Sequence, residues 1–169
     1  MPVTPVSSRN RVLYLVALLL ACVCVAGGVL AYLERGERAD ARAEQERYGA
    51  VLASARTEAT ALVNIDYRDP QAAIDAITAG ATGEFKEQLD QGAGPLTEIL
   101  EQGQATRSGK VVWAGVVAVD ADSARVIVAT EGTVTSTGTD QSRAENFRMQ
   151  LDLERVDGDW LTSKLEFIK

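Results

Sequence analysis

The hydrophobic positions of this chain form three successive patterns, and the first is an unbroken apolar run from Val12 to Leu33. The run contains no charged side chain and no proline. At about 1.5 Å of rise per residue, a helix of this length spans roughly 30 Å, the hydrocarbon thickness of a bilayer. Because backbone groups in lipid must pair within their own segment, we predict one transmembrane helix over residues 12–33. A short cytoplasmic tail, residues 1–11, precedes it.

The sequence around this run leaves its processing open. Arg9 and Arg11 followed by an apolar run also describe a secretory signal, and Leu19–Cys22 has the look of a lipobox. The apolar core of a signal is typically about 7–15 residues, so the longer run here favours an uncleaved anchor. Arginines lie on both sides of the run, and their count does not orient it. The short N-terminal tail favours a C-terminal domain outside the cytoplasm.

Small residues recur on one face of the predicted transmembrane helix. Small side chains let membrane helices approach closely, so this face predicts contact with a partner helix. The alternative is the ordinary glycine and alanine content of membrane helices. The residues of this face are Ala21, Cys24, Gly28 and Ala31.

The second pattern is helical periodicity, which begins directly after the apolar run. Residues 34–47 are charged on all sides and predict a helical stalk. An apolar stripe then predicts that this helix continues to Ile65 against a core. The stripe consists of Tyr48, Val51, Leu52, Ala55, Ala59, Leu62 and Val63. A short coiled coil is the alternative, although it would place Glu44 and Glu58 on the seam.

Shorter helices are predicted after Ile65. Asp69 suits an N-cap and Pro70 a first helical residue, and Gly80 is a plausible stop. A further helix starts near Thr82. The stretch Gly92–Pro95 predicts a turn, after which Pro95 opens another helix.

The third pattern is alternation with a period of two from Lys110 onwards, which predicts antiparallel strands. Turns are expected at Asp120–Ser123 and, as a type I′ hairpin, at Asp157–Gly158, with a polar loop from Ser136 to Arg143. The alternating apolar positions are Val111, Trp113, Val117 and Val119, then Ala124, Val126, Val128 and Thr130, then Phe147, Met149, Leu151 and Leu153, with a last strand from Trp160 to Ile168.

Helices followed by a meander predict an α+β fold, with one curved antiparallel sheet of about four strands covered by helices on one face. The length of the chain after the predicted anchor suits a single outer domain over residues 48–169. The chain has a net charge of −7, and its acidic residues all follow Leu33. Such a surface repels nucleic acid and anionic headgroups, so we expect no nucleic-acid partner.

The composition also argues against most enzyme chemistry. The chain has no histidine, and Cys22 and Cys24 both lie in the apolar run. We therefore expect no catalytic residue, no metal site and no cofactor in the outer domain. The strongest candidate pair is Asp66 and Tyr67, because an Asp base with a Tyr donor is a known pocket design. A turn between two helices explains the pair better.

The order of these parts resembles the Mce-associated membrane proteins of actinobacteria. The resemblance is carried by the anchor with its Glu/Arg/Ala-rich helix, then Asp66-Tyr67-Arg68, Thr82-Gly83-Glu84-Phe85, the Lys110–Val119 strand and the Asp157–Trp160 hairpin. It implies the cone-shaped fold of nuclear transport factor 2 and ketosteroid isomerase. It also implies structural roles for Tyr67, Arg68, Thr82, Gly83 and Phe85, with Gly83 turning the backbone and Phe85 filling the cone.

The resemblance implies a non-enzymatic accessory subunit that supports an Mce-type lipid-import complex in the cell envelope. Three other functions stay open. The chain could be an anchored core component of a type IV secretion-like complex, a cone that binds a lipid or sterol, or an isomerase-like or hydrolase-like enzyme.

Overall fold

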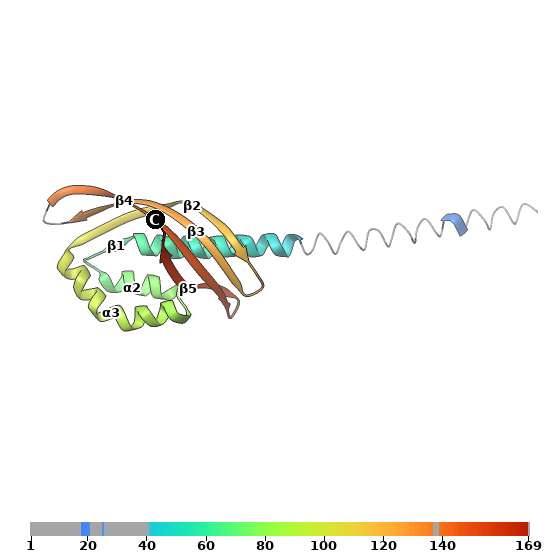
Figure 1. The fold of residues 1–169 in the computed structure, drawn as a ribbon, viewed down its shortest axis with the longest axis horizontal. Helices are drawn as coiled ribbons and strands as arrows, with labels where there is room; N and C mark the ends of the chain where they lie inside the picture. Colours follow the sequence, from blue (N-terminus) through green and yellow to red (C-terminus); the bar gives the residue numbers. More distant parts are fainter. Residues whose placement is uncertain (1–17, 21–24, 26–40, 137–138, 169) are drawn as a thin grey trace, which may run out of the picture. The chain divides into compact units, whose positions relative to one another are not determined.

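The computed structural model describes residues 18–20, 25, 41–136 and 139–168 (Figure 1). It divides the chain into two compact units, Met1–Gln45 and Glu46–Lys169. The described residues of the first unit are helical. No helix within the described ranges is both long enough and apolar enough to cross a bilayer.

Several predictions fall outside the described residues. They are the tail (1–11), most of the anchor (12–33), the first part of the stalk (34–47) and the small-residue face of Ala21, Cys24, Gly28 and Ala31. These stay predictions.

The second unit contains a five-stranded antiparallel sheet in the order β1-β2-β3-β4-β5, with helices on one side. Figure 1 shows the sheet curving over the first helix, with α2 and α3 on the same side of the sheet. The elements are the part of the first helix that lies in this unit (residues 46–63), β1 (Ile65–Asp66), α2 (Pro70–Ala79), α3 (Gly83–Gly103), β2 (Ala105–Val119), β3 (Ser123–Ser136), β4 (Thr139–Val156) and β5 (Asp159–Phe167). The predicted α+β class and its meander are confirmed, and β1 is an additional short strand.

The main core lies between the first helix and the inner face of the sheet. The helix contributes Val51, Ala55, Ala59 and Val63, which recur every fourth residue and are buried. Its alanines allow the helix to lie close to the sheet. The strands contribute Ala124, Val126, Val128, Met149, Leu151, Leu153 and Trp160. The predicted alternation of β3 and β4 is therefore confirmed, whereas Tyr48, the first member of the predicted stripe, is exposed.

The first helix ends earlier than predicted. It stops at residue 63, and Ile65 instead pairs with Arg107 in the sheet. Asn64 makes the transition because its side-chain amide donates to the Gly109 carbonyl at 2.9 Å and accepts from the Gly109 N–H at 3.1 Å. These two bonds substitute for a strand neighbour of Gly109.

The helix α2 has the predicted start, because the Asp69 carboxylate accepts from the Ala72 N–H at 3.1 Å. By contrast, the predicted turn at Gly92–Pro95 is wrong, since α3 runs through Pro95 without a break. The half-buried positions Leu89, Ala93, Leu96 and Leu100 continue one apolar face across the proline, while Pro95 itself is exposed. Packing along this face outweighs the hydrogen bond that proline removes.

The sheet differs from the prediction in two respects. β2 begins at Ala105 and β4 at Thr139, so the strands are longer and the expected polar loop at Ser136–Arg143 is short. The register of β2 against β3 also shifts between Val111 and Trp113, and again between Val116 and Ala118. These β-bulges break the expected alternation. Trp113 and Val117 are 56% and 57% exposed, and the inner positions are Val111, Ala114, Val116 and Val119.

Both predicted tight hairpins are present. The Asp120 N–H donates to the Ser123 carbonyl at 2.8 Å between β2 and β3. Asp157 and Gly158, between β4 and β5, have φ angles of 53° and 101°, as a type I′ turn requires.

Candidate functional site

Asp66 and Arg68 form a local pair in the turn between β1 and α2. The Arg68 guanidinium donates from Nη2 to Asp66 Oδ2 at 2.7 Å and from Nε to Oδ1 at 3.0 Å. The Arg68 backbone N–H donates to Oδ1 as well, at 3.0 Å. These hydrogen bonds hold the pKa of Asp66 below its ordinary value. The carboxylate is thus ionised, and its oxygens already accept hydrogen bonds from Arg68. This arrangement stabilises a turn, whereas a general base at neutral pH needs a raised pKa.

The second motif group lies at the opposite edge of the sheet, beside β5. The Thr82 N–H donates to the Thr162 carbonyl at 2.8 Å, and Gly83 follows with a φ of +53°. Phe85 is buried with Ile77 and Ala81 in a small cluster, separate from the main core. The structure therefore brings Thr82, Gly83 and Phe85 together, and it places Tyr67 and Arg68 at the other edge.

The interior of the cone is filled by its own side chains. Met149, Leu151 and Val126 have no exposed surface. A cavity lined by Val63, Arg107, Thr130 and Phe147, among others, has a volume of only about 10 Å³. Arg107 stacks over the Phe147 ring at 5.9 Å and pairs with Glu145 at 3.3 Å, at the edge of this cavity. Ligand pockets typically have volumes of about 300–1,000 Å³, so this cavity holds no lipid.

Among the described residues of the domain one ionisable side chain is buried, Glu58 of the first helix, which is 2% exposed. Its carboxyl lies against Gly80, so close that a Cβ atom there would be 1.8 Å from Oε2. Glu58 Oε1 is buried without a hydrogen-bond partner, as is the hydroxyl of Thr162. Burial raises the pKa of Glu58 to about 7. This group can therefore gain or lose a proton near neutral pH.

Glu58 was not predicted as a site residue, although its position in the sequence contains a signal. The residue lies at helical spacing from Val51, Ala55 and Leu62, on the face of the helix that is otherwise apolar. Nothing in the sequence alone shows that Gly80 lies opposite it.

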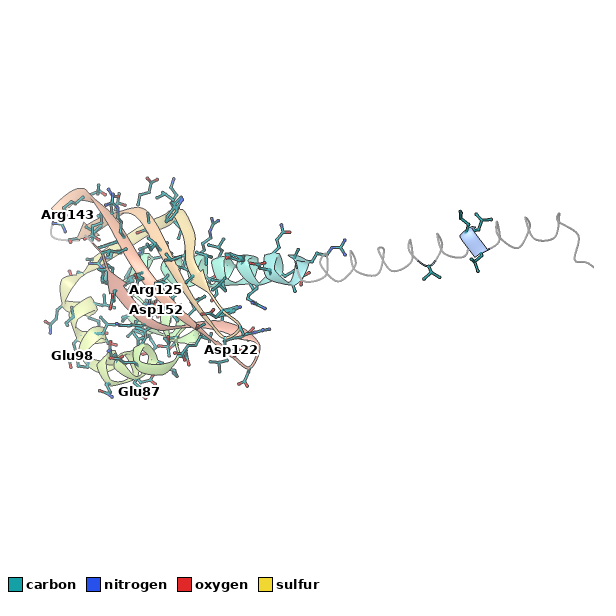
Figure 2. All side chains as sticks on the ribbon, turned by 45° about the vertical axis from the view of Figure 1, so that its right-hand side comes forward. Glu87, Glu98, Asp122, Arg125, Arg143 and Asp152 are labelled. Carbon is teal, nitrogen blue, oxygen red and sulfur yellow. The ribbon has the colours of Figure 1, made fainter. Side chains whose placement is uncertain are left out.

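The outer face of the sheet combines exposed apolar side chains with paired charges. Lys110 pairs with Glu131 at 2.9 Å, and Arg125 pairs with Asp152 at 2.6 Å. Figure 2 shows Arg125 and Asp152 side by side on neighbouring strands. Beside these pairs Val112, Trp113 and Val117 are each half exposed or more. The Trp113 ring reaches over Gly115, where a Cβ atom would lie 2.6 Å from the ring.

The charges of the molecule are unevenly distributed between this face and the helices. The register places four basic and five acidic side chains of the described residues on the outer face, a net charge of −1. They are Lys110, Arg125, Arg148 and Lys164 against Glu131, Asp152, Glu154, Asp159 and Glu166. The segment of α2 and α3, residues 69–104, has seven acidic residues and one lysine, a net charge of −6. Glu87 and Glu98 project from α3 in Figure 2. A second acidic surface would therefore meet less repulsion on the outer face of the sheet than on the helical layer.

A family model described as uncharacterized protein Rv1363c/MT1408-like matches residues 10–169. The chain belongs to this family. A Mycobacterium tuberculosis relative, uncharacterized protein Rv1363c, is 25% identical over 155 residues, which cover 90% of this chain and 59% of the relative. The chain thus spans about 59% of the length of this curated relative. Neither description mentions Mce systems, so that finer resemblance stays a prediction.

Three solved structures have a similar fold. The periplasmic domain of DotI has a TM-score of 0.59 at 15% identity, over 71% of this chain and 94% of that one. An IcmL-like type IV secretion system protein of Legionella pneumophila has a TM-score of 0.54 at 10% identity, over 70% and 91%. A ketosteroid isomerase-like protein of Erwinia carotovora atroseptica has a TM-score of 0.55 at 24% identity, over 73% and 98%. At such identities the likeness shows the fold alone, an α+β nuclear transport factor 2-like fold with a curled antiparallel sheet.

Proposed function

We propose that this chain is a non-enzymatic, membrane-anchored assembly subunit of a cell-envelope complex, and that its folded domain binds protein partners. The proposal rests on the difference between the interior of the folded domain and its surface. The interior is filled, with a cavity of about 10 Å³, whereas apolar side chains are exposed on the outer face of the sheet. A filled interior favours protein binding over the binding of a lipid or sterol. Exposed tryptophan and valine beside charge pairs are typical of a protein interface.

Two kinds of envelope complex are candidates. The fold likeness to the periplasmic domain of DotI and to an IcmL-like type IV secretion protein favours a core component of a secretion-like complex. The motifs around Tyr67-Arg68 and Thr82–Phe85 favour an accessory subunit of an Mce-type lipid-import complex. In both cases the predicted anchor over residues 12–33 holds the domain at the membrane, and its small-residue face packs on a partner helix.

The decisive experiment is co-purification of the full chain from gently solubilised membranes, with identification of the partners. We expect stable partners for the native chain and their loss for Trp113→Ser. Ile99→Ser is the matched control, because Ile99 is also a large exposed apolar residue but lies on α3. Recovery of the native chain alone, repeatedly, would contradict the proposal, and equal loss with both variants would contradict the role of the outer face. The identity of the partners separates the two kinds of complex.

The proposed orientation has its own test. The part of the chain after Cys24 contains no cysteine, so a single cysteine can be introduced there as a probe. Asp122 is suitable because it is exposed in the hairpin between β2 and β3. In a background with Cys22→Ala and Cys24→Ala, we expect Asp122→Cys to react with a membrane-impermeant maleimide on intact cells. Labelling only after lysis would place the domain in the cytoplasm.

A further inference from the structure

The buried carboxyl of Glu58 lies where the α2–α3 connection meets β5. This connection is bound to the strand through its backbone: the Thr162 N–H donates to the Gly80 carbonyl at 2.8 Å, and the Thr82 N–H donates to the Thr162 carbonyl at 2.8 Å. Ala81 forms a parallel bridge with Thr162 between these two bonds. Gly80, which has no side chain, receives the Glu58 carboxyl on its Cα.

No opposite charge is paired with this carboxyl among the described residues. The carboxyl lies against Gly80 of the connection, whose carbonyl accepts from the Thr162 N–H of β5, and neither residue has a titratable side chain. On the first helix itself, the nearby Ser54 hydroxyl donates to the Trp160 carbonyl instead. Glu58 takes part in no ion pair of the described residues, and burial alone raises its pKa to about 7. An ionised carboxylate here would lack the water or cation that such a charge requires.

From this geometry we propose that Glu58, Gly80 and Thr162 form a proton-operated latch. With Glu58 protonated, the connection stays closed against the first helix and β5. Loss of the proton admits water at the junction and releases the α2–α3 layer locally, while the main core stays folded.

The release is local because the α2–α3 layer has few other attachments. Apart from the junction it is bound by a small apolar cluster of Ile77, Ala81 and Phe85 with their neighbours, and by the buried Ala73 and Ile74 of α2. The first helix and the strands share the larger cluster that includes Val126, Met149 and Leu151. Segments with few buried apolar contacts open before the core does.

The direction of the pH effect follows from linkage. The pKa of Glu58 is about 7 in the folded state against 4.5 when free in water, so the closed form retains a proton that the open form loses between these values. The closed form is therefore increasingly disfavoured as pH rises through this window, and the effect levels off above pH 7. Between pH 6 and pH 8.5 the opening equilibrium shifts by about tenfold.

Hydrogen exchange of the full-length chain in detergent, read by peptide mass spectrometry, tests this latch. The native chain is compared with Glu58→Gln at each pH, because the ratio of their rates cancels the intrinsic pH dependence of exchange. We expect the ratio for peptides covering residues 70–103 to rise about tenfold from pH 6 to pH 8.5. Peptides from β3 and β4 should show no such rise. Glu87→Gln, which removes a charge from an exposed position on α3, is the control.

A constant ratio over residues 70–103 would overturn the latch. An equal rise in β3 and β4 would overturn it too, because the carboxyl would then act on global stability. If Glu58→Gln does not fold, Glu58→Met serves in its place, since methionine is unbranched, similar in length and uncharged.

Discussion

The carboxyl of Glu58 fills the space that a side chain at position 80 would need. A methyl group at Gly80 would lie 1.8 Å from Glu58 Oε2, so the buried Glu58 side chain would have to shift to accommodate it. We expect Gly80→Ala to destabilise the native chain by about 1–3 kcal/mol, the usual penalty of overpacking. In a Glu58→Ala background the same substitution should be nearly neutral. Denaturant unfolding of the four chains measures this coupling, and equal effects in both backgrounds would contradict the contact.

The ion pair of Asp66 and Arg68 can be tested through the pKa of Asp66. Hydrogen bonds from Arg68 lower the pKa of Asp66, so any stability that the pair contributes is present above the ordinary pKa of Asp and lost as pH falls. We expect Arg68→Ala to move the pKa of Asp66 upwards towards its ordinary value. Titration of the Asp66 carboxyl carbon by NMR measures the shift, and Lys86→Ala serves as a control on α3. An unchanged pKa in Arg68→Ala would show that the Asp66–Arg68 pair is absent in solution.

The faces of the strands were predicted correctly where apolar and polar residues alternate strictly, and wrongly where a β-bulge interrupts the strand. Val126 and Val128 alternate cleanly, and their faces follow directly from the sequence. Trp113 is apolar and in phase with Val111, yet it lies on the outer face because a bulge intervenes. A bulge leaves no signature in side-chain type, so the exposed patch of the candidate site could not be predicted. The Glu58–Gly80 contact was hidden for a similar reason, since it joins two helices that are separate in sequence.

The continuity of α3 through Pro95 can be tested by replacing the proline. Proline inside a helix is less favourable than alanine by about 3 kcal/mol, and Pro95 is exposed, so its replacement disturbs no packing. We expect Pro95→Ala to stabilise the domain by about 1–3 kcal/mol in thermal or denaturant unfolding. Gly94→Ala, which has open space at its Cβ, should add about 0.5–1 kcal/mol by the same logic. A turn at this site would instead make Pro95→Ala neutral or destabilising, through the greater entropy of the unfolded chain.

The two sides of the folded unit differ in charge. The helical layer concentrates negative charge and contains the junction of Glu58, whereas the outer face of the sheet is nearly neutral and exposes Trp113 and Val117. Two copies of this chain that approach through their helical layers repel each other, so for such a pair the outer face is the favoured contact. A proton gained at Glu58 would then alter the helical layer without altering the contact face.

The folded domain should not depend on the segment that precedes it. Residues 46–169 form their own compact unit, and every member of the main core lies within it. We therefore expect a chain of residues 46–169 to unfold in a single cooperative transition, followed by the fluorescence of Trp160 in a Trp113→Phe background. A chain of residues 64–169 should not fold, because it lacks Val51, Ala55 and Ala59, which fill the concave side of the sheet. Folding of the shorter chain would show that the sheet stands without the first helix, and failure of the longer one would show that the preceding segment is part of the domain.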